Sequence, residues 1–310
     1  MNEAARLPAA EVKQQAAAGS QRAASRFDHI YVMGAGRSGT TLLSIMLGAH
    51  PAAGVRGELL QFAEYWRRNL QCSCGKPVRE CGHWLEAGRE LPGDDAACAA
   101  RYDRLISESE RHWRVAQYLL APRTAARAYV EALRRLFVSL NPSGMVVDAS
   151  KYVARALVLN AIPDFRVGYV YIVRDARGVL YSFGKPVQQP KSAMAAALYY
   201  VLVNGAAQLA VWTRLRGRAI KVRYEDLVAE PARELDRIGR FLGLDMSGVI
   251  ASIAAGEPLD IGHMVSGNRI RTSGVIKVGL DDEWRGLSVM RRVAYYLACL
   301  PIQLINRYRV

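Results

Sequence analysis

The sequence predicts an α/β protein in which helices flank a parallel β-sheet and one long helical region is inserted. A short apolar run at 29–33 precedes a glycine-rich turn, and an apolar helical segment follows at 42–49. Short apolar runs then alternate with longer helical patterns, which is the order that produces parallel sheets. Residues 59–140 instead read as helices alone and are predicted to form the insertion.

Each predicted element has a local cause. The first strand, His29–Met33 (HIYVM), is rich in apolar and β-forming residues, and the helix at 42–49 carries an apolar stripe that ends before Pro51. Three more short apolar runs predict strands, at 145–147, 168–173 and 219–224. A helical stripe at 235–242 is closed by Gly243.

The chain is long enough for one sizeable domain. Its 310 residues are 51% hydrophobic and 23% charged, which excludes a wholly disordered protein. Residues 1–26 lack the apolar segment of a secretory signal, and their composition, rich in Ala, Gln and Ser, predicts a flexible tail. Residues 27–310 are predicted to form a single domain. The apolar stretch 193–211 contains Asn204, Gly205 and Gln208 and is predicted to be a buried helix, so we expect a cytoplasmic protein.

A net charge of +14, from 42 Lys and Arg against 28 Asp and Glu, suggests a polyanionic partner. Nucleic acid, an acidic membrane surface and a phosphorylated small molecule all fit this charge. The basic residues are spread through the predicted helices, where such charges usually mark a solvated surface. We therefore expect no specific nucleic-acid role, while peripheral contact with an anionic membrane stays open.

The five cysteines argue against a disulfide framework, since their number is odd and no secretory signal precedes them. Four soft ligands for zinc stand close together in one segment: Cys72, Cys74, Cys81 and His83. Their spacing departs from the usual C-x2-C pattern, which favours a reduced loop without metal over a zinc site.

The glycine-rich turn has the residues of a phosphate-binding loop. Between the strand and the helix, Gly34-x4-Gly39 lets successive backbone N–H groups point at an anion, aided by the helix dipole. Arg37 adds a cation, and Thr40 and Thr41 add hydroxyl donors. The spacing nearly matches the nucleotide P-loop, and Thr40 replaces the lysine that reaches the β- and γ-phosphates. This weakens an ATPase interpretation.

A second anion site is predicted at the end of the strand 168–173. Arg174 would lie at the carboxyl edge of the sheet, where ligands of open α/β sheets bind. Ser182 follows about two helical turns later and could face the same anion. The alternative is a solvated Arg174–Asp175 pair that only caps a helix.

The two motifs together, GRSGTTLL and VRDARGVLYS, resemble sulfotransferases that use 3′-phosphoadenosine 5′-phosphosulfate (PAPS). The resemblance extends from about residue 29 to about residue 286. It implies that the first motif binds the 5′-phosphosulfate end through Gly36, Arg37, Ser38, Gly39, Thr40 and Thr41. It also implies that Arg174 and Ser182 bind the 3′-phosphate. An arginine at position 37 resembles the carbohydrate, tyrosyl-protein and bacterial branches.

Further segments resemble the same family. Tyr224, in KVRYEDL, corresponds to the strand end near the adenine, with a core tyrosine as the alternative. The run Gly267-Asn-Arg-Ile-Arg271 resembles the segment that closes over the nucleotide. The resemblance makes Asn268, Arg269 and Arg271 candidate nucleotide contacts, the two arginines for the 3′-phosphate, with a solvated basic loop as the alternative.

Sulfuryl transfer needs an in-line attack on sulfur, a base for the acceptor proton and charge stabilisation on the leaving oxygen. By resemblance to the tyrosyl-protein branch, Glu58 is the candidate base. The segment Asp148-Ala-Ser-Lys151 resembles a bacterial D-S-S-K element. Lys151 would reach the leaving-group oxygens, Ser150 would orient it and Arg37 would add charge. We expect no metal to be required.

The acceptor is not identified by the sequence and can be a sugar, a lipid head group, a phenol or a protein tyrosine. The helical region and 183–200 are expected to line its pocket, and the oligomeric state is open. One alternative function is a P-loop kinase of a small molecule, for which Asp148 is the only well-placed magnesium ligand. Another is a basic protein that binds nucleic acid or a membrane surface.

Overall fold

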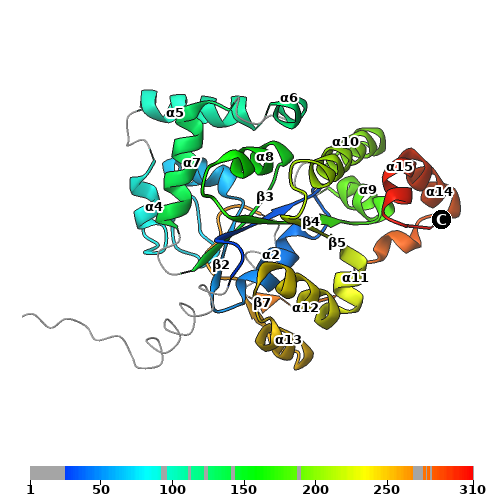
Figure 1. Ribbon diagram of the computed structural model, residues 1–310. Coiled ribbons are helices and arrows are strands. Elements are labelled where there is room, and N and C mark those ends of the chain that lie inside the picture. Colours follow the sequence, from blue (N-terminus) through cyan, green and yellow to red (C-terminus); the bar gives the residue numbers. More distant parts are fainter. Residues whose placement is uncertain are drawn as a thin grey trace, which may run out of the picture.

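A five-stranded, entirely parallel sheet forms the centre of the computed structural model (Figure 1). The model describes residues 25–91, 96–110, 113–121, 125–140, 144–186, 190–267, 275–276, 278–279 and 281–309. The strand order is β2-β3-β1-β4-β5. The strands are β1 (His29–Met33), β2 (Ala53–Gly57), β3 (Met145–Lys151), β4 (Val167–Val173) and β5 (Ala219–Arg223). The α/β class predicted from the sequence is confirmed.

Helices cover both faces of the sheet (Figure 1). One face is covered by α2 (Thr40–Gly48), α11 (Tyr224–Ala229), α12 (Pro231–Leu242) and α13 (Ser247–Ala254). The other face carries most of the remaining helices: η1 (Leu59–Gln61), α3 (Phe62–Arg67), α4 (Leu85–Arg89), α5 (Ala96–Ser109), α6 (Arg114–Leu120), α7 (Arg127–Ser139), α8 (Val153–Ala161), α9 (Ala176–Gly184), α10 (Ala193–Trp212), α14 (Val289–Ala298) and α15 (Leu300–Ile305). A short pair, β6 (Leu259–Asp260) and β7 (Val275–Ile276), and η4 (Glu283–Gly286) complete the described elements.

The sheet separates two hydrophobic cores. In β4, Tyr169 and Tyr171 point into the core beneath α8 and α10, whereas Val170 and Ile172 point into the core beneath α2 and α12. Every residue of β1 and β4 is buried, because helices cover both faces. This explains why these strands read as continuous apolar runs rather than alternating patterns.

The strand predictions hold for β1 and β4, and two other elements differ from expectation. β3 continues past Asp148 to Lys151, because its polar end pairs with β1 and with η1. β5 ends at Arg223, and Tyr224 begins α11 instead of closing the strand. β2 was not predicted, since its sequence AGVRG has only one strong strand former and relies on pairing with β3.

Helix α10 is buried on one side only. Ala196, Tyr200 and Asn204 face the core, while Met194, Leu198 and Leu202 are more than half exposed. By length and composition this helix could cross a membrane, but 44% of its apolar window is buried inside the protein. The predicted buried helix is therefore correct for its inner face, and the outer face is an exposed apolar stripe.

The predicted boundary of the tail at residue 26 stays a prediction, because residues 1–24 lie outside the described part of the chain. The first described residues already contact the domain. Ser25 donates to the carbonyl oxygens of Phe27 and Leu242, and Arg26 donates to the carbonyl oxygen of Gly217.

Candidate active site at the carboxyl edge of the sheet

The glycine turn joins β1 to α2 and is pressed against its neighbours. A Cβ atom on Gly34 would lie 2.2 Å from the carbonyl oxygen of Ile172, and one on Gly39 would lie 2.5 Å from the Tyr224 ring. Gly39 has φ +91° and caps α2, while Arg37 has φ +69°, a conformation that non-glycine residues rarely adopt. Glycine is therefore required at both ends of the turn, and Arg37 is held under backbone strain.

The turn presents donors that have no partner within the described chain. Ser38 is fully buried, yet its Oγ makes no hydrogen bond to any residue that the structure describes. Thr40 and Thr41 are also buried, and the first turn of α2 carries neither an acidic residue nor a side-chain cap. A buried hydroxyl and free helix N–H groups together suit a bound anion.

Arg174 lies beside this turn at the end of β4 and is 5% exposed. One guanidinium nitrogen donates to the carbonyl oxygen of Arg37 at 3.3 Å, and the other donates to the carbonyl oxygen of Asp281 at 2.5 Å. The Asp281 carboxylate lies 3.3 Å away, and the guanidinium stacks over the Tyr224 ring at 4.5 Å. Its Nε has no partner among the described residues. The predicted second anion site thus adjoins the first.

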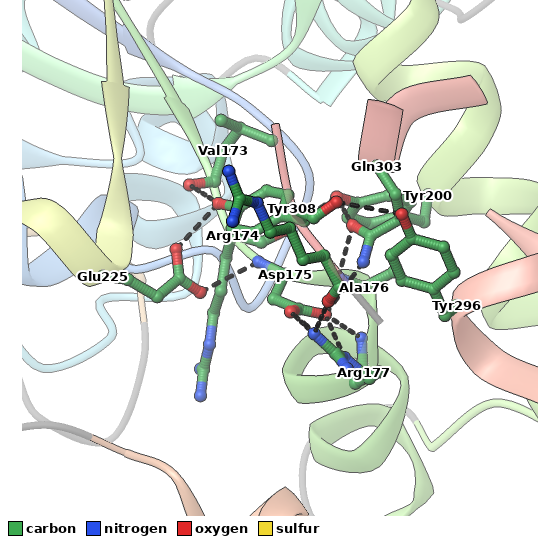
Figure 2. A network of polar contacts seen from close by, with 11 residues as sticks. Val173, Arg174, Asp175, Ala176, Arg177, Tyr200, Glu225, Tyr296, Gln303 and Tyr308 are labelled. Atoms are coloured by element: carbon green, nitrogen blue, oxygen red, sulfur yellow. Dashed lines mark hydrogen bonds and ion pairs between the residues drawn. The ribbon is translucent and has the colours of Figure 1, made fainter. Parts of the chain in front are cut away.

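Side chains from distant parts of the chain hold the backbone around Arg174 (Figure 2). The hydroxyls of Tyr200 and Tyr308 donate to the carbonyl oxygens of Arg174 and Val173, at 2.6 and 3.3 Å. The Glu225 carboxylate accepts from the N–H of Asp175 at 2.9 Å. Three backbone groups at the end of β4 therefore have side-chain partners, which hold the backbone of Arg174 in place.

Asp175 caps α9, as the sequence predicts. Its carboxylate accepts from the N–H and guanidinium of Arg177, and Gln303 of α15 donates to the same carboxylate at 3.0 Å (Figure 2). Arg177 in turn stacks over the Trp284 ring of η4 at 4.5 Å. Capping by Asp175 and anion binding by Arg174 are therefore compatible, and the two interpretations weighed on the sequence are not exclusive.

Glu58 and Lys151 form an ion pair beside the phosphate-binding turn. Lys151 Nζ lies 2.5 Å from Glu58 Oε1, and the side chains are 23% and 11% exposed. Lys151 ends β3 with φ +73°, and its carbonyl oxygen accepts from the N–H of Gly34 at 3.5 Å. The two predicted catalytic residues are thus brought together, next to the start of the turn.

Ser150 and Asp148 have roles different from those expected. Ser150 Oγ accepts from the N–H of Leu60 at 3.0 Å and donates to Asp148, so it holds the backbone after Glu58 rather than orienting Lys151. Asp148 is fully buried and also accepts from Leu59 N–H and Arg155 Nε, at 3.3 and 3.0 Å. Its oxygens are engaged in the protein interior, which removes the magnesium ligand that a kinase would need.

Sequence reasoning missed one contact with the turn. The hydroxyl of Tyr199 accepts from the N–H of Gly36 at 3.0 Å, and its ring packs edge-on against Phe183 at 5.5 Å. Arg37 and Lys191 both lie within 6 Å of the Phe183 ring centre. Burial raises the pKa of the Tyr199 hydroxyl. A tyrosine pair in an alanine-rich helix signals hydroxyls that need partners, which here are the turn and Arg174.

Two of the five remaining predicted nucleotide contacts lie in the described part of the chain. Ser182 lies half-buried on α9, two turns after Arg174. Tyr224 is 5% exposed and packs between Gly39 and Arg174, with Asp281 N–H donating to its hydroxyl at 3.3 Å. Asn268, Arg269 and Arg271 lie outside the described residues.

The cysteine segment folds into a compact cluster with one different ligand. The sulfur atoms of Cys72, Cys74 and Cys81 lie together with Nδ1 of His263, all within 4.8 Å of one another. His83, the predicted fourth ligand, stacks on the His263 ring at 4.7 Å and is not part of this set. The sequence offered His83 as the fourth ligand, whereas in the structure His263, a residue far along the chain, completes the cluster.

Comparisons with known proteins give one consistent result. A family model described as the sulfotransferase family matches residues 29–248. The sulfotransferase domain from the curacin biosynthetic pathway is 20% identical, covers 92% of this chain and 99% of its own, and has a TM-score of 0.55. A sulfotransferase domain from the olefin synthase of Synechococcus PCC 7002 is 19% identical, covers 91% and 95%, and has a TM-score of 0.52. No curated protein matched the chain in sequence.

Proposed function

Because the chain belongs to the sulfotransferase family, we propose that it moves a sulfuryl group from PAPS to a hydroxyl or amine of an acceptor. The observation that supports this proposal is that, within the described part of the chain, two buried groups with unpartnered donors lie next to each other. The phosphate-binding turn has an unpartnered Ser38 hydroxyl, and Arg174 has an unpartnered Nε among the described residues. A donor with one anionic group at each end matches two such sites.

The residues of the turn and of β4 would hold the donor. The N–H groups of the turn and the hydroxyls of Ser38, Thr40 and Thr41 would receive its 5′-phosphosulfate end. Arg174 and Ser182 would receive its 3′-phosphate, since a guanidinium can donate two parallel hydrogen bonds to phosphate oxygens. The donor supplies an activated sulfur and a nucleotide leaving group. The protein contributes position and positive charge.

Glu58 and Lys151 supply the proton and charge chemistry. The Glu58 carboxylate would accept the proton of the acceptor hydroxyl as that oxygen attacks. Lys151 Nζ would donate to the oxygen on which negative charge develops, and Arg37 would add charge at the same turn. Their ion pair keeps both groups beside the turn before substrates bind.

Two features speak against the other functions weighed on the sequence. Thr40 stands where a P-loop kinase has lysine, and Asp148 is enclosed among Arg155, Ser150 and Leu59. The positive charge is partly spent on intramolecular ion pairs, including those of Arg166, Arg177 and Arg237. Neither a kinase nor a nucleic-acid-binding protein is favoured. The acceptor class, among sugar, lipid head group, phenol and tyrosine, is the open part of the proposal.

The test is transfer of labelled sulfate from PAPS to a panel of acceptors from these four classes. For the acceptor that reacts, Glu58→Gln should lower kcat by about 10²–10⁴, the usual contribution of a general base. Binding of adenosine 3′,5′-bisphosphate (PAP) should change little, because in the proposed mechanism Glu58 would meet the acceptor rather than the nucleotide. Glu64→Gln is the matched control, since Glu64 makes an exposed helical ion pair with Arg68. Full activity in Glu58→Gln would reject Glu58 as the base.

A further inference from the structure

We propose that Cys72, Cys74, Cys81 and His263 bind one zinc ion that ties two distant segments of the chain together. The three thiols come from one loop, and the imidazole comes from a segment 182 residues after Cys81. Three sulfur ligands and one nitrogen ligand form one of the usual structural zinc sets. This inference does not depend on the proposed sulfuryl transfer.

The ligand atoms already stand at tetrahedral spacing. Cys74 Sγ lies 3.8 Å from Cys81 Sγ, and His263 Nδ1 lies 3.8 Å from Cys72 Sγ and 3.2 Å from Cys81 Sγ. A tetrahedral zinc site with Zn–S bonds of about 2.3 Å has ligand atoms roughly 3.5–3.8 Å apart. The longest separation in the set is within 4.8 Å, so small side-chain rotations suffice to bind the ion.

The loop is shaped to hold its sulfur atoms. Cys72 and Cys81 are buried, while Cys74 is exposed. The N–H of Cys72 donates to the carbonyl oxygen of Lys76, and Gly75 turns the chain with φ +85°. Trp84 Nε1 donates to Cys72 Sγ at 3.3 Å, a contact that suits a thiolate. Indole and backbone groups thus orient the thiols before a metal binds.

Hydrogen bonds already join the two segments that the ion would link. Ser73 N–H donates to the carbonyl oxygen of Met264 at 3.1 Å, and Ser73 Oγ donates to the carbonyl oxygen of Gly262 at 2.6 Å. The N–H of Met264 donates back to Ser73 Oγ at 2.8 Å. His263 is therefore held over the cysteine loop by its two neighbours, and the site is preorganised.

The same segment reaches the candidate active site. The N–H of Val265, two residues after His263, donates to the carbonyl oxygen of Arg56 at 3.1 Å. The carbonyl oxygen of Val265 accepts from the N–H of Glu58 at 2.9 Å. A zinc ion with four protein ligands has no open position for chemistry, so its role here is to anchor the segment that holds Glu58.

Metal analysis of the purified full-length protein tests the site. We expect about one zinc per chain by mass spectrometry of the metal in the wild type. His263→Ala should lose most of it, whereas His263→Cys should retain it, because a four-cysteine set also binds zinc. His83→Ala is the matched control, since His83 stacks on His263 without joining the ligand set. Retention by His83→Ala and His263→Cys distinguishes loss of a ligand from loss of fold.

Cobalt substitution and thermal unfolding test the site independently of the zinc content. Replacement of zinc by cobalt should give the visible absorption of a tetrahedral thiolate site, and a chelator should lower the melting temperature of the wild type but not of His263→Ala. Equal zinc content in His263→Ala and the wild type would overturn the ligand assignment. A metal-free wild type that takes up no added zinc, with Cys74 and Cys81 joined as a disulfide, would overturn the site itself.

Discussion

At the scale of single residues, the candidate active site depends on strand ends that are neighbours in the sheet. Glu58 follows β2 and Lys151 ends β3, and these two strands pair in parallel. Two residues that are 93 positions apart in the sequence therefore form an ion pair. Asp148 and Ser150 then hold the N–H groups of Leu59 and Leu60. The base candidate is therefore positioned by residues that never meet a substrate.

In the proposed complex, Asp281 would compete with the 3′-phosphate for Arg174. The Asp281 carboxylate lies 3.3 Å from the Arg174 guanidinium and is partly exposed. Asp281→Asn should remove this competition and tighten PAP binding by up to about fivefold, which corresponds to about 1 kcal/mol for a partly exposed ion pair. Calorimetric titration with PAP measures the effect. Asp282→Asn serves as control because, among the described residues, the ion-pair partner of Asp282 is Arg285 at 3.7 Å. Weaker binding of PAP to Asp281→Asn would contradict this prediction.

At the scale of elements, the turn between β1 and α2 tolerates no side chain at Gly39. Gly39→Ala combines a φ of +91° with a Cβ 2.5 Å from the Tyr224 ring, so both stability and PAP affinity should fall. The conformational part alone exceeds about 1 kcal/mol. Gly256→Ala isolates that part, since Gly256 has φ +70° and open space around its Cβ position. Unfolding in urea and PAP titration should separate the two variants, and equal PAP affinity in both would argue against a binding role for the turn.

The elements that the sequence predicts best are those with a strong local pattern. The buried strands β1 and β4 and the helices α2 and α10 carry apolar runs whose length and flanking residues indicate the type of element. The strand β2 escaped prediction because Gly54 and Gly57 weaken its strand pattern, and pairing with β3 alone keeps it extended. The exposed apolar stripe of α10 was not predicted, because an apolar sequence pattern does not show which side of the helix the neighbouring elements cover.

Sequence patterns likewise indicated only part of the candidate site. Arg37, Arg174, Glu58 and Lys151 belong to local motifs, so a resemblance to a family was enough to name them. Tyr199, Asp281 and His263 approach from distant parts of the chain, and only the packing of α10 and of the C-terminal half brings them in. The sequence pointed to His83 because it follows Cys81 closely, whereas His263 comes near the cysteines only in the folded chain.

At the scale of the whole molecule, a buried charge network joins the helical insertion to the sheet. Arg155 of α8 donates to Asp148 of β3 and to Glu110, at 3.0 and 2.7 Å, and all three side chains are almost fully buried. One guanidinium cannot fully compensate two carboxylates away from water. Burial raises the pKa of Glu110 to about 7, with Asp148 adding to the rise.

This network predicts a pH-dependent stability. A raised pKa in the folded state means that stability is greatest below the ordinary glutamate pKa and is lost as the pH rises towards 7. The difference from 4.5 to about 7 corresponds to at most about 3 kcal/mol. Urea unfolding between pH 5 and 8 should show this decline in the wild type. Glu110→Gln should flatten it, and an unchanged slope in that variant would exclude Glu110 as its source.

Part of the net charge of +14 lies close to the candidate active site. Arg37, Arg174 and Lys151 lie at one edge of the sheet, where Arg174 pairs with the partly exposed Asp281 and Lys151 pairs with Glu58. Arg155 and Arg177 pair with buried carboxylates. We propose that this edge holds a nucleotide with phosphate-type groups at both its 3′ and 5′ positions.

The most direct measurement is calorimetric titration of the protein with PAP and with ATP, in the wild type and in Arg174→Ala. We expect PAP to bind more tightly than ATP and to lose at least about tenfold in affinity when Arg174 is removed, since a buried charge contact is lost. Arg166→Ala, which breaks an exposed pair with Asp28, should leave PAP binding unchanged. Tighter binding of ATP, or undiminished PAP affinity in Arg174→Ala, would contradict the account.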